Sequence, residues 1–148
     1  IFNWKGNSIQ YSDKYHRKIE LKYAEKLFKL SHIQFIIINK EELSSEEKSI
    51  IDKYSNIYYI GNNIDINKAF YDTINIMRHV KGVITTDTSI IHLAANLDVL
   101  SYLCLTYNSE WRWGHEYKSI WYPNINLIRQ EKICVWDNVI DKLITILK

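Results

Sequence analysis

Short apolar runs alternate with longer amphipathic segments along this chain. Four runs are apolar almost throughout and rich in β-branched and aromatic residues, at 33–38, 56–60, 82–86 and 101–105. Such runs are typical of strands covered on both faces, as in a parallel sheet. They predict four neighbouring parallel strands in one sheet, and residues 1–4 and 126–130 predict two more.

The segments between the runs have the spacing of helices. Helices are predicted over 18–30, 44–54, 67–80 and 88–97, with a closing amphipathic helix over 135–147. The second opens with Ser-Ser-Glu-Glu, the signature of a capping box. Strands that alternate with helices predict an α/β domain, with helices on both faces of a parallel sheet. Residues 5–18 and 106–124 lack this periodicity and are expected to form loops.

Composition and charge narrow the class of protein. A chain of 148 residues that is 47% hydrophobic suits one globular domain, residues 1–148. The net charge is +2 with acids and bases interspersed, so no nucleic-acid partner is expected. No apolar run approaches the roughly eighteen residues of a membrane span, and no signal peptide is visible. Cys104 and Cys134 lack metal or redox spacing, so reduced thiols and a cytoplasmic location are expected.

Polar residues at the ends of the predicted strands form the first candidate site. In open α/β sheets, ligands bind at the carboxyl ends of the strands. The small or polar residues found there are Lys5, Gly6, Asn7, Asn39, Lys40, Gly61, Asn62, Asp87, Thr88, Ser89, Tyr107 and Asn108. The Asp-Thr-Ser triplet at 87–89 opens a predicted helix, whose amides and dipole suit a phosphate, and His92 follows on nearly the same face. The structural alternatives are an ordinary N-cap and a packed histidine.

The loop at 5–18 is expected at the same edge of the sheet. Arg17 or Lys5 would neutralise a phosphate, and Asp13 would orient Arg17 or serve as a base. The alternative interpretation is a solvated surface loop.

The second loop is dense in aromatic residues. Trp111, Trp113 and Trp121 are predicted to be mostly buried against the domain, although one or two aromatic rings would instead stack on a base or sugar. No DxD motif or His and acidic ligand set occurs, so no metal site is expected. Neither a GxGxxG loop nor a GxSxG elbow occurs, which argues against a dinucleotide enzyme and a serine hydrolase.

Six blocks in order along the chain point to one family. NWKGN, AFYDT, TTDTSIIHLAANL, EWRWG, WYPN with NLIRQ, and VWDNVI resemble the heptosyltransferase-like domain of glycosyltransferase family 9. The resemblance is greatest to the form found at the carboxyl end of bacterial tetratricopeptide-repeat proteins. It implies a Rossmann-like domain that forms the donor-binding lobe of a GT-B glycosyltransferase.

The resemblance also implies site residues and partners. Asp87, Thr88, Ser89 and His92 would line the donor pyrophosphate and sugar, and Gly6, Asn7, Asp13 and Arg17 match a W-x-G-N…D…R loop that faces the same cleft. The substrate would be a nucleoside diphosphate sugar, with no metal or other cofactor and with Asp13 as the candidate catalytic residue. The implied reaction is inverting transfer of a hexosyl or heptosyl group. Because the sequence begins at Ile1 without a Met, an acceptor lobe or repeat region is expected upstream.

The chain departs from the family pattern in three places. Ile120 stands where the family usually has proline before Trp-Tyr-Pro. Residues 98–101 replace a turn that usually contains glycine, and Ser89 stands where the classical heptosyltransferases have glycine. Heptose therefore does not follow as the donor sugar. The alternative function is a non-catalytic module that keeps the fold and binds a nucleotide sugar or another protein.

Overall fold

One parallel sheet forms the centre of the molecule. The computed structural model describes residues 1–6 and 17–148, except for the side chain of Asn62. The strands are β1 Phe2–Asn3, β2 Phe35–Ile37, β3 Ile57–Tyr59, β4 Val83–Thr86, β5 Ser101–Leu105 and β6 Ile125–Arg129. Their order is β3-β2-β1-β4-β5-β6, and every pairing between them is parallel. All six predicted strands are confirmed, and the fold is Rossmann-like.

The order of the strands corrects one prediction. The four long apolar runs do not all neighbour one another, because β1 lies between β2 and β4. Phe2 pairs with Ile37 on one side and with Ile84 on the other. Hydrophobic patterning reports that a strand is buried on both faces, but it carries no information about which strand lies next to it. The strand order reverses at β1 and β4, and this reversal positions the candidate site.

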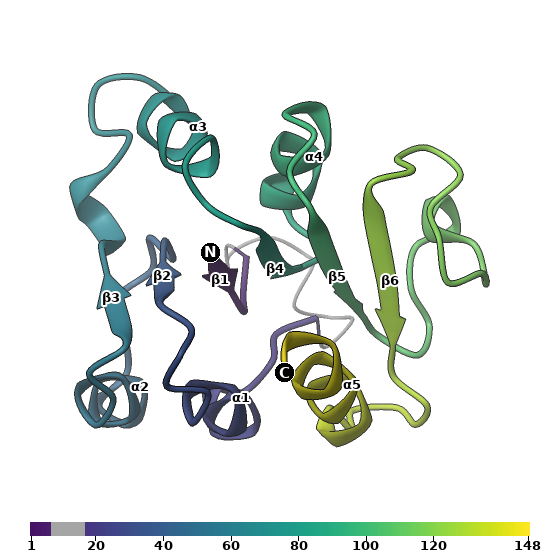
Figure 1. The fold of residues 1–148 in the computed structure, drawn as a ribbon, viewed down its shortest axis with the longest axis horizontal. Coiled ribbons are helices and arrows are strands. Elements are labelled where there is room, and N and C mark those ends of the chain that lie inside the picture. The colour runs from purple at the N-terminus through teal and green to yellow at the C-terminus, as the bar shows by residue number, and fades with distance from the viewer. Residues whose placement is uncertain (7–16) are drawn as a thin grey trace.

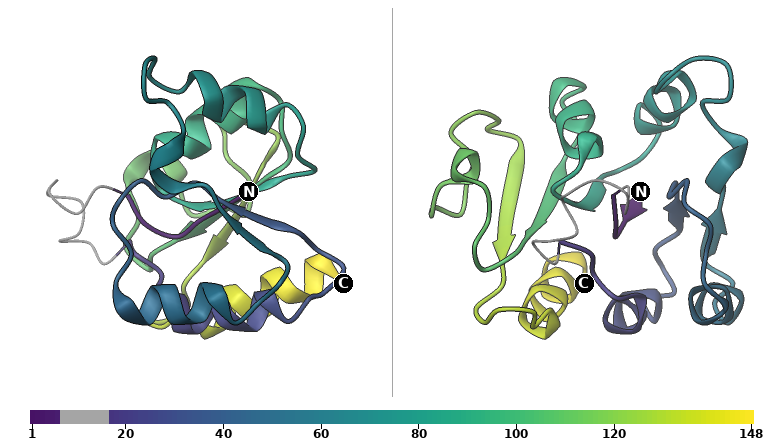
Figure 2. Two further views of the ribbon diagram at one scale, coloured as in Figure 1. Left: turned by 90° about the vertical axis from the view of Figure 1, so that its left-hand side faces the viewer. Right: turned by 180° about the vertical axis from the view of Figure 1, so that it is seen from behind.

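Five helices cover the two faces of the sheet. They are α1 Leu21–Phe28, α2 Ser45–Asp52, α3 Tyr71–Met77, α4 Ser89–Asn96 and α5 Asp137–Leu147. Helices α1, α2 and α5 lie on one face, and α3 and α4 lie on the other (Figure 1). The edge-on and rear views show the same two layers of helices (Figure 2). The predicted helices are confirmed, with each one shorter at one or both ends than the sequence pattern indicated.

Aromatic residues in and directly after β1 anchor the larger core. The Phe2 ring centroid lies 5.9 Å from that of Trp4 and 5.7 Å from that of Phe28, and all three side chains are buried. This core fills the space between the sheet and α1, α2 and α5. A second group around Met77 and Val83 packs beneath α3 and α4. Burial of this apolar surface is the main favourable contribution to folding.

The capping box predicted at the start of α2 is present. The Ser44 hydroxyl accepts a hydrogen bond from the Glu47 amide at 3.1 Å, and the Glu47 carboxylate accepts one from the Ser44 amide at 3.0 Å. The two side chains satisfy backbone donors that the first turn of a helix leaves without partners.

The outer edge of β6 is covered by other parts of the chain. The Leu127 amide donates to the Tyr117 carbonyl at 2.9 Å, and Lys118 forms an antiparallel bridge with Asn126. Farther along, the Asn138 side-chain amide donates to the Arg129 carbonyl at 2.9 Å. An exposed strand edge would invite pairing with another chain, so these contacts also protect the molecule from aggregation.

The turn after α4 uses Asp98 where the family resemblance leads us to expect glycine. Asp98 has a φ of 56°, in the left-handed region. The Asp98 amide donates to the Ala95 carbonyl at 3.2 Å, and the Val99 amide donates to the Ala94 carbonyl at 3.0 Å. These two bonds form a Schellman motif, in which glycine is the favoured residue.

Replacement of Asp98 by Gly should therefore stabilise the protein. We expect the free energy of unfolding to rise by roughly 0.5–1 kcal/mol. The left-handed conformation costs a residue with a Cβ roughly 1–2 kcal/mol, and the greater backbone freedom of glycine in the unfolded chain offsets part of that gain. Urea denaturation would measure the change. Asp98→Val is the matched control and should lower stability, since a β-branched side chain tolerates a positive φ least. A loss of stability in Asp98→Gly would contradict this explanation of the turn.

Candidate functional site

An ion pair marks the carboxyl edge of the sheet beside the point where the strand order reverses. The Arg17 Nη1 lies 3.3 Å from the Asp87 carboxylate and donates to the Asp87 carbonyl at 3.0 Å. Asp87 directly follows β4 and is buried, whereas Arg17 is about a quarter exposed. In doubly wound sheets, ligands bind in the crevice at this reversal of strand order. The structure thus brings together two residues that the sequence predicted for the site.

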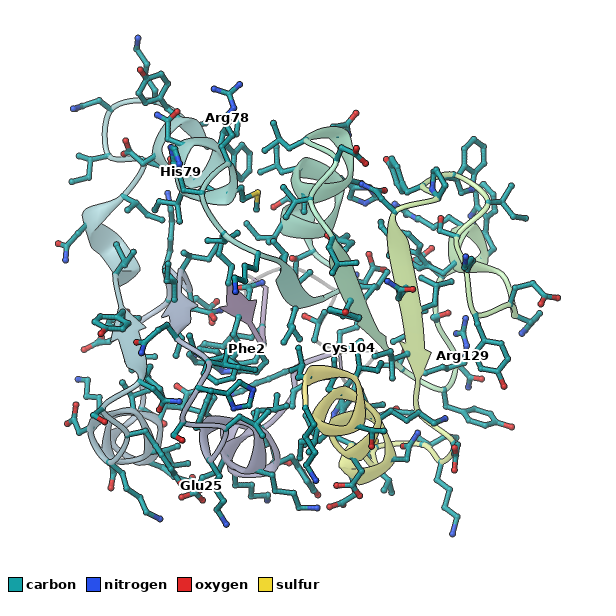
Figure 3. All side chains as sticks on the ribbon, viewed as in Figure 1. Phe2, Glu25, Arg78, His79, Cys104 and Arg129 are labelled. Carbon is teal, nitrogen blue, oxygen red and sulfur yellow. The ribbon has the colours of Figure 1, made fainter. Side chains whose placement is uncertain are left out.

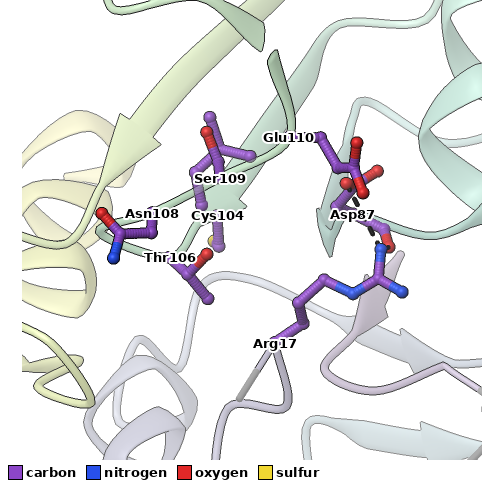
Figure 4. Close-up of a pocket in the computed structure, with 8 residues that line it drawn as sticks. Arg17, Asp87, Cys104, Thr106, Asn108, Ser109 and Glu110 are labelled. Atoms are coloured by element: carbon purple, nitrogen blue, oxygen red, sulfur yellow. Dashed lines mark hydrogen bonds and ion pairs between the residues drawn. The ribbon is translucent and has the colours of Figure 1, made fainter. Parts of the chain in front are cut away.

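A polar pocket of about 200 Å³ opens beside this ion pair. Its lining residues are Arg17, Asp87, Cys104, Leu105, Thr106, Asn108, Ser109 and Glu110. Thr106, Asn108 and Ser109 lie across the pocket from Asp87 and Glu110, and the dashed contact joins Arg17 to Asp87 (Figure 4). Hydroxyl, amide and carboxylate groups on facing walls suit a ligand with several hydroxyl groups.

A buried network holds the turn between β4 and α4. The Thr88 hydroxyl caps α4 by accepting from the Ile90 amide at 3.3 Å. The Asn3 side-chain amide donates to the hydroxyls of Thr85 and Thr88, at 3.1 and 3.3 Å. Thr88 is therefore fixed from two strands, while Ser89, the first residue of α4, is exposed. The N-terminal end of this helix, where partial positive charge favours an anion, lies next to the pocket.

Gly6 lies close to the same turn. A Cβ built on Gly6 would be 3.3 Å from the Thr88 methyl group, which is closer than about nine in ten Cβ contacts in proteins. Because the Thr88 side chain is held by several hydrogen bonds, it has little room to move away. The absence of a side chain at Gly6 thus lets the backbone at this position approach the start of α4.

The structure assigns Lys5 a different role from the predicted phosphate contact. The Lys5 ammonium lies 3.1 Å from the Glu47 carboxylate, and both side chains are almost fully buried. Burial opposes ionisation of Glu47, but hydrogen bonds from the Ser44 amide, Lys5 and Trp4 outweigh it and lower the pKa of Glu47 to about 2. Lys5 therefore packs against α2 and forms a buried ion pair with a protein carboxylate.

The loops that follow β2 and β3, at the same carboxyl edge of the sheet, are also held by contacts within the protein. The Asn39 side-chain amide donates to the Lys5 carbonyl at 2.9 Å, and the Lys40 ammonium lies 3.5 Å from Asp65. Gly61 has a φ of 53° and lies beneath the ring of Tyr59. These side chains stabilise the loops after β2 and β3 and do not line the pocket.

His92 contacts the aromatic loop. Its Nδ1 lies 3.1 Å from the Tyr122 hydroxyl, and its ring stacks on Trp113 with centroids 5.5 Å apart. Desolvation lowers the pKa of His92; Asp87 opposes this shift and Arg112 adds to it. The structure therefore places His92 one helical turn from the Asp87 turn but does not include it among the residues that line the pocket.

The loop at 106–124 corrects the prediction for its tryptophans. Trp113 is 2% exposed and packs with Ile91 and Leu127 over β5 and β6, as expected. Trp111 and Trp121 are 79% and 63% exposed, so the prediction was wrong for these two indoles. Aromatic density in the sequence did not distinguish the residue that anchors the loop from its neighbours, which point outward.

Arg129 fixes the wall of the pocket from the edge of the sheet. Its guanidinium donates to the Ser109 hydroxyl, to the Thr106 carbonyl at 3.5 Å and to the Gly114 carbonyl at 2.6 Å. Figure 3 shows Arg129 beside β6, on the side where the loop lies. Thr106 and Ser109 both line the pocket, so Arg129 determines its shape without lining it.

Sequence reasoning missed several residues of the site. Asn3, Thr85 and Arg129 are polar residues within or at the end of mostly apolar strands, and this polarity was the available signal. Thr106, Ser109 and Glu110 follow β5. In that segment only Tyr107 and Asn108 were predicted from the sequence as candidates. Two predicted site residues, Asn7 and Asp13, lie outside the described residues.

Searches for two other features were negative. Over residues 1–6 and 17–148, no three His, Cys, Asp or Glu side chains gather in a way that could hold a metal ion. Within the same part of the chain, every helix is too short or too polar to cross a membrane.

Comparison of the chain with protein-family models, with curated proteins and with solved structures found no match. The family resemblance in the sequence blocks therefore stays a prediction.

The position of His92 makes stability depend on pH. Because the pKa of His92 is lower in the folded protein than the usual value of 6.5, the unfolded chain binds the proton more readily. This contribution to stability is present above about pH 6.5 and is lost as the pH falls through the lower pKa of the folded state. Urea unfolding of the wild type between pH 7 and pH 5 should show this loss.

His92→Phe keeps a ring on Trp113 and should flatten that pH dependence. The matched control is His79→Phe, at an exposed position, which should retain the slope of the wild type. Equal slopes in the wild type and His92→Phe would contradict the assignment.

Replacing Arg129 by lysine should weaken the hydrogen bonds that hold the loop at 106–124. We expect Arg129→Lys to lower the free energy of unfolding by roughly 1–3 kcal/mol, since one ammonium cannot reach all three acceptors and leaves polar groups without partners. Urea denaturation followed by tryptophan fluorescence would measure it, with the exposed Arg78→Lys as control. If both variants unfold at the wild-type urea concentration, Arg129 does not hold the loop.

Proposed function

We propose that this chain is the donor-binding lobe of a metal-independent GT-B glycosyltransferase that uses a nucleoside diphosphate sugar. One observation carries the proposal: the Arg17–Asp87 pair borders a polar pocket beside the start of α4, next to the reversal of strand order. The sequence blocks that resemble glycosyltransferase family 9 provide independent support.

The site has separate chemical environments for the two parts of such a donor. The N-terminal end of α4, with the Thr88 hydroxyl and the exposed Ser89, suits the diphosphate. Arg17 carries five N–H donors, so it can hold Asp87 and also contribute to a phosphate oxygen. The adjoining pocket, with its hydroxyl and carboxylate groups, suits the sugar ring.

The reaction that follows is displacement at the anomeric carbon. An acceptor hydroxyl would attack that carbon as its bond to the diphosphate oxygen breaks, and the nucleoside diphosphate would leave with the bonding electron pair. The acceptor proton would pass to a general base, for which Asp13 is the candidate from the resemblance. Cationic groups and helix amides would stabilise the leaving diphosphate, the task that a metal performs in other transferases. The acceptor would be bound by an upstream lobe.

A second candidate function rests on the exposed part of the aromatic loop. Trp111, Tyr117, Ile120 and Trp121 are each more than 60% exposed within one segment of eleven residues. Exposed apolar surface of this kind often marks a contact with another protein. In this alternative the domain keeps the fold and serves as a binding or assembly module without turnover.

Ligand-dependent stability would test the proposal. A panel of nucleoside diphosphates and nucleotide sugars should contain a compound that raises stability by roughly 2.7 kcal/mol at a concentration a hundred times its Kd, as measured by thermal shift. Arg17→Gln should weaken that binding at least tenfold, because it removes a charge-assisted hydrogen bond.

The matched control is Arg78→Gln, at an exposed position just after α3 and away from the pocket (Figure 3). It should bind like the wild type. A panel without any stabilising compound, at millimolar concentrations and with folded protein, would argue against the donor-binding role and for the assembly module.

A further inference from the structure

The contacts that cover the outer edge of β6 leave two of its backbone groups open. The Leu127 amide donates to the Tyr117 carbonyl, so Leu127 and, two residues on, Arg129 turn their backbone groups away from β5. The Asn138 side chain occupies the Arg129 carbonyl. No described residue bonds to the two groups between these contacts, the Leu127 C=O and the Arg129 N–H. An acceptor and a donor of the sheet edge are therefore open next to each other.

A groove of about 800 Å³ lies against this part of the edge. It is bounded by residues 115–117 of the aromatic loop, by residues 126–131 and by residues of α5 between Asn138 and Ile146. Figure 1 shows β6 as the last strand of the sheet, with the loop beyond it and α5 near its end. The groove is therefore wide enough for a segment of extended chain beside β6.

Arg129 brings a positive charge to this groove that no described acid neutralises. Its guanidinium donates only to uncharged acceptors, the Ser109 hydroxyl and the Thr106 and Gly114 carbonyls. Burial lowers the pKa of Arg129, and no carboxylate is close enough to oppose this effect. The three bonds leave two of the five N–H donors of a guanidinium for a ligand, and a carboxylate is the acceptor that binds them most strongly.

The acids of the groove do not compete for Arg129. Glu131 pairs with Lys142 at 2.9 Å, and Asp141 lies 3.4 Å from Lys26. Glu116 is exposed to solvent, where its charge is screened.

One residue of an added parallel strand would satisfy both open backbone groups. In a parallel ladder, a residue that lies opposite Ile128 donates to the Leu127 C=O and accepts from the Arg129 N–H. Its side chain would lie on the face of Ile128, which packs with the core beneath α5, and the next side chain would lie on the face of Arg129. Ile146 of α5 lines the groove and is 50% exposed. An apolar residue followed by an acidic residue therefore matches the two faces of the groove.

We infer that the edge of β6 binds an extended peptide segment of a partner protein as an added parallel strand, with an apolar residue opposite Ile128 and an acidic residue beside Arg129. Main-chain hydrogen bonds and side-chain contacts of alternate residues are the usual basis of such strand addition. The inference is independent of the donor-binding function, because the groove and the pocket beside Arg17 share no lining residue.

The experiment selects random heptapeptides displayed on phage against the whole chain. Enriched peptides would be synthesised, and their Kd values measured by fluorescence anisotropy. Each would also be made with the acidic residue replaced by its amide, and with one backbone amide at a time N-methylated. Ile146→Glu changes the wall of the groove, and Ile66→Glu is the matched control at an exposed isoleucine outside it.

We expect the enriched peptides to share an apolar–acidic pair, and their amide forms to bind roughly tenfold more weakly. Methylation of the amide of the apolar residue should weaken binding at least tenfold, because that N–H donates to Leu127. Methylation of the next amide, which points away from β6, should change the Kd less than threefold. Ile146→Glu should bind at least fivefold more weakly than the wild type, and Ile66→Glu should bind like it.

Arg129→Gln tests the carboxylate contact from the protein side. It should bind the acidic and amide forms of a peptide within threefold of each other, because the charge that distinguishes them is gone. Where the loss of loop hydrogen bonds prevents Arg129→Gln from folding, the methylated peptides and Ile146→Glu decide the result.

Four results would overturn the inference. They are a selection that enriches no peptide, binding that is unaffected by Ile146→Glu, methylation effects without the expected alternation, and a tenfold preference for the acidic form that survives in folded Arg129→Gln. Acetate that displaces a peptide at the concentration of the peptide itself would identify a site for small anions and would also overturn it.

Discussion

Parallel pairing of β1 with both β2 and β4 is the constraint on which the rest of the structure depends. It places a strand of only two residues at the centre of the sheet, with Phe2 bonded into the ladders on both sides. Since all six strands run the same way, every loop that follows a strand lies at one edge. Gly6 and Arg17 therefore approach Thr88 and Asp87, although about seventy or more residues separate them in sequence.

Two basic residues at this edge have different environments. The difference assigns a structural role to Lys5 and a place in the candidate site to Arg17. Lys5 is buried against Glu47, where removing either partner would leave an uncompensated charge in the core. Arg17 pairs with Asp87 at the border of an open polar pocket and remains partly exposed. Arginine suits this second position, because its planar group can bind two acceptors at once. Lysine, a compact point charge, suits the enclosed position better.

The sequence was most informative where burial alone decides structure. Alternating apolar runs and helical periods predicted each strand and helix, and Ser44 with Glu47 predicted the capping box, because these signals are local. Strand order was not predictable, since the placement of β1 depends on pairing between segments far apart. Asp87, Thr88 and Arg17 were found because each follows or approaches the end of a strand. Arg129 and Glu110 were missed, because their importance comes from a loop conformation that no periodicity encodes. Trp111 and Trp113 show the same limit: they are two residues apart, yet one is exposed and the other buried.

Mapping a ligand onto the backbone amides of the folded protein would show whether the carboxyl edge of the sheet at β1 and β4 is the binding site. The measurement is a ¹⁵N–¹H correlation spectrum of the labelled chain, titrated with nucleoside diphosphates and nucleotide sugars. We expect the largest shift changes to fall on Gly6, Thr88, Ser89 and Thr106, around the Arg17–Asp87 pair. Shift changes confined to the larger groove between β6 and α5, or none at millimolar ligand, would contradict it.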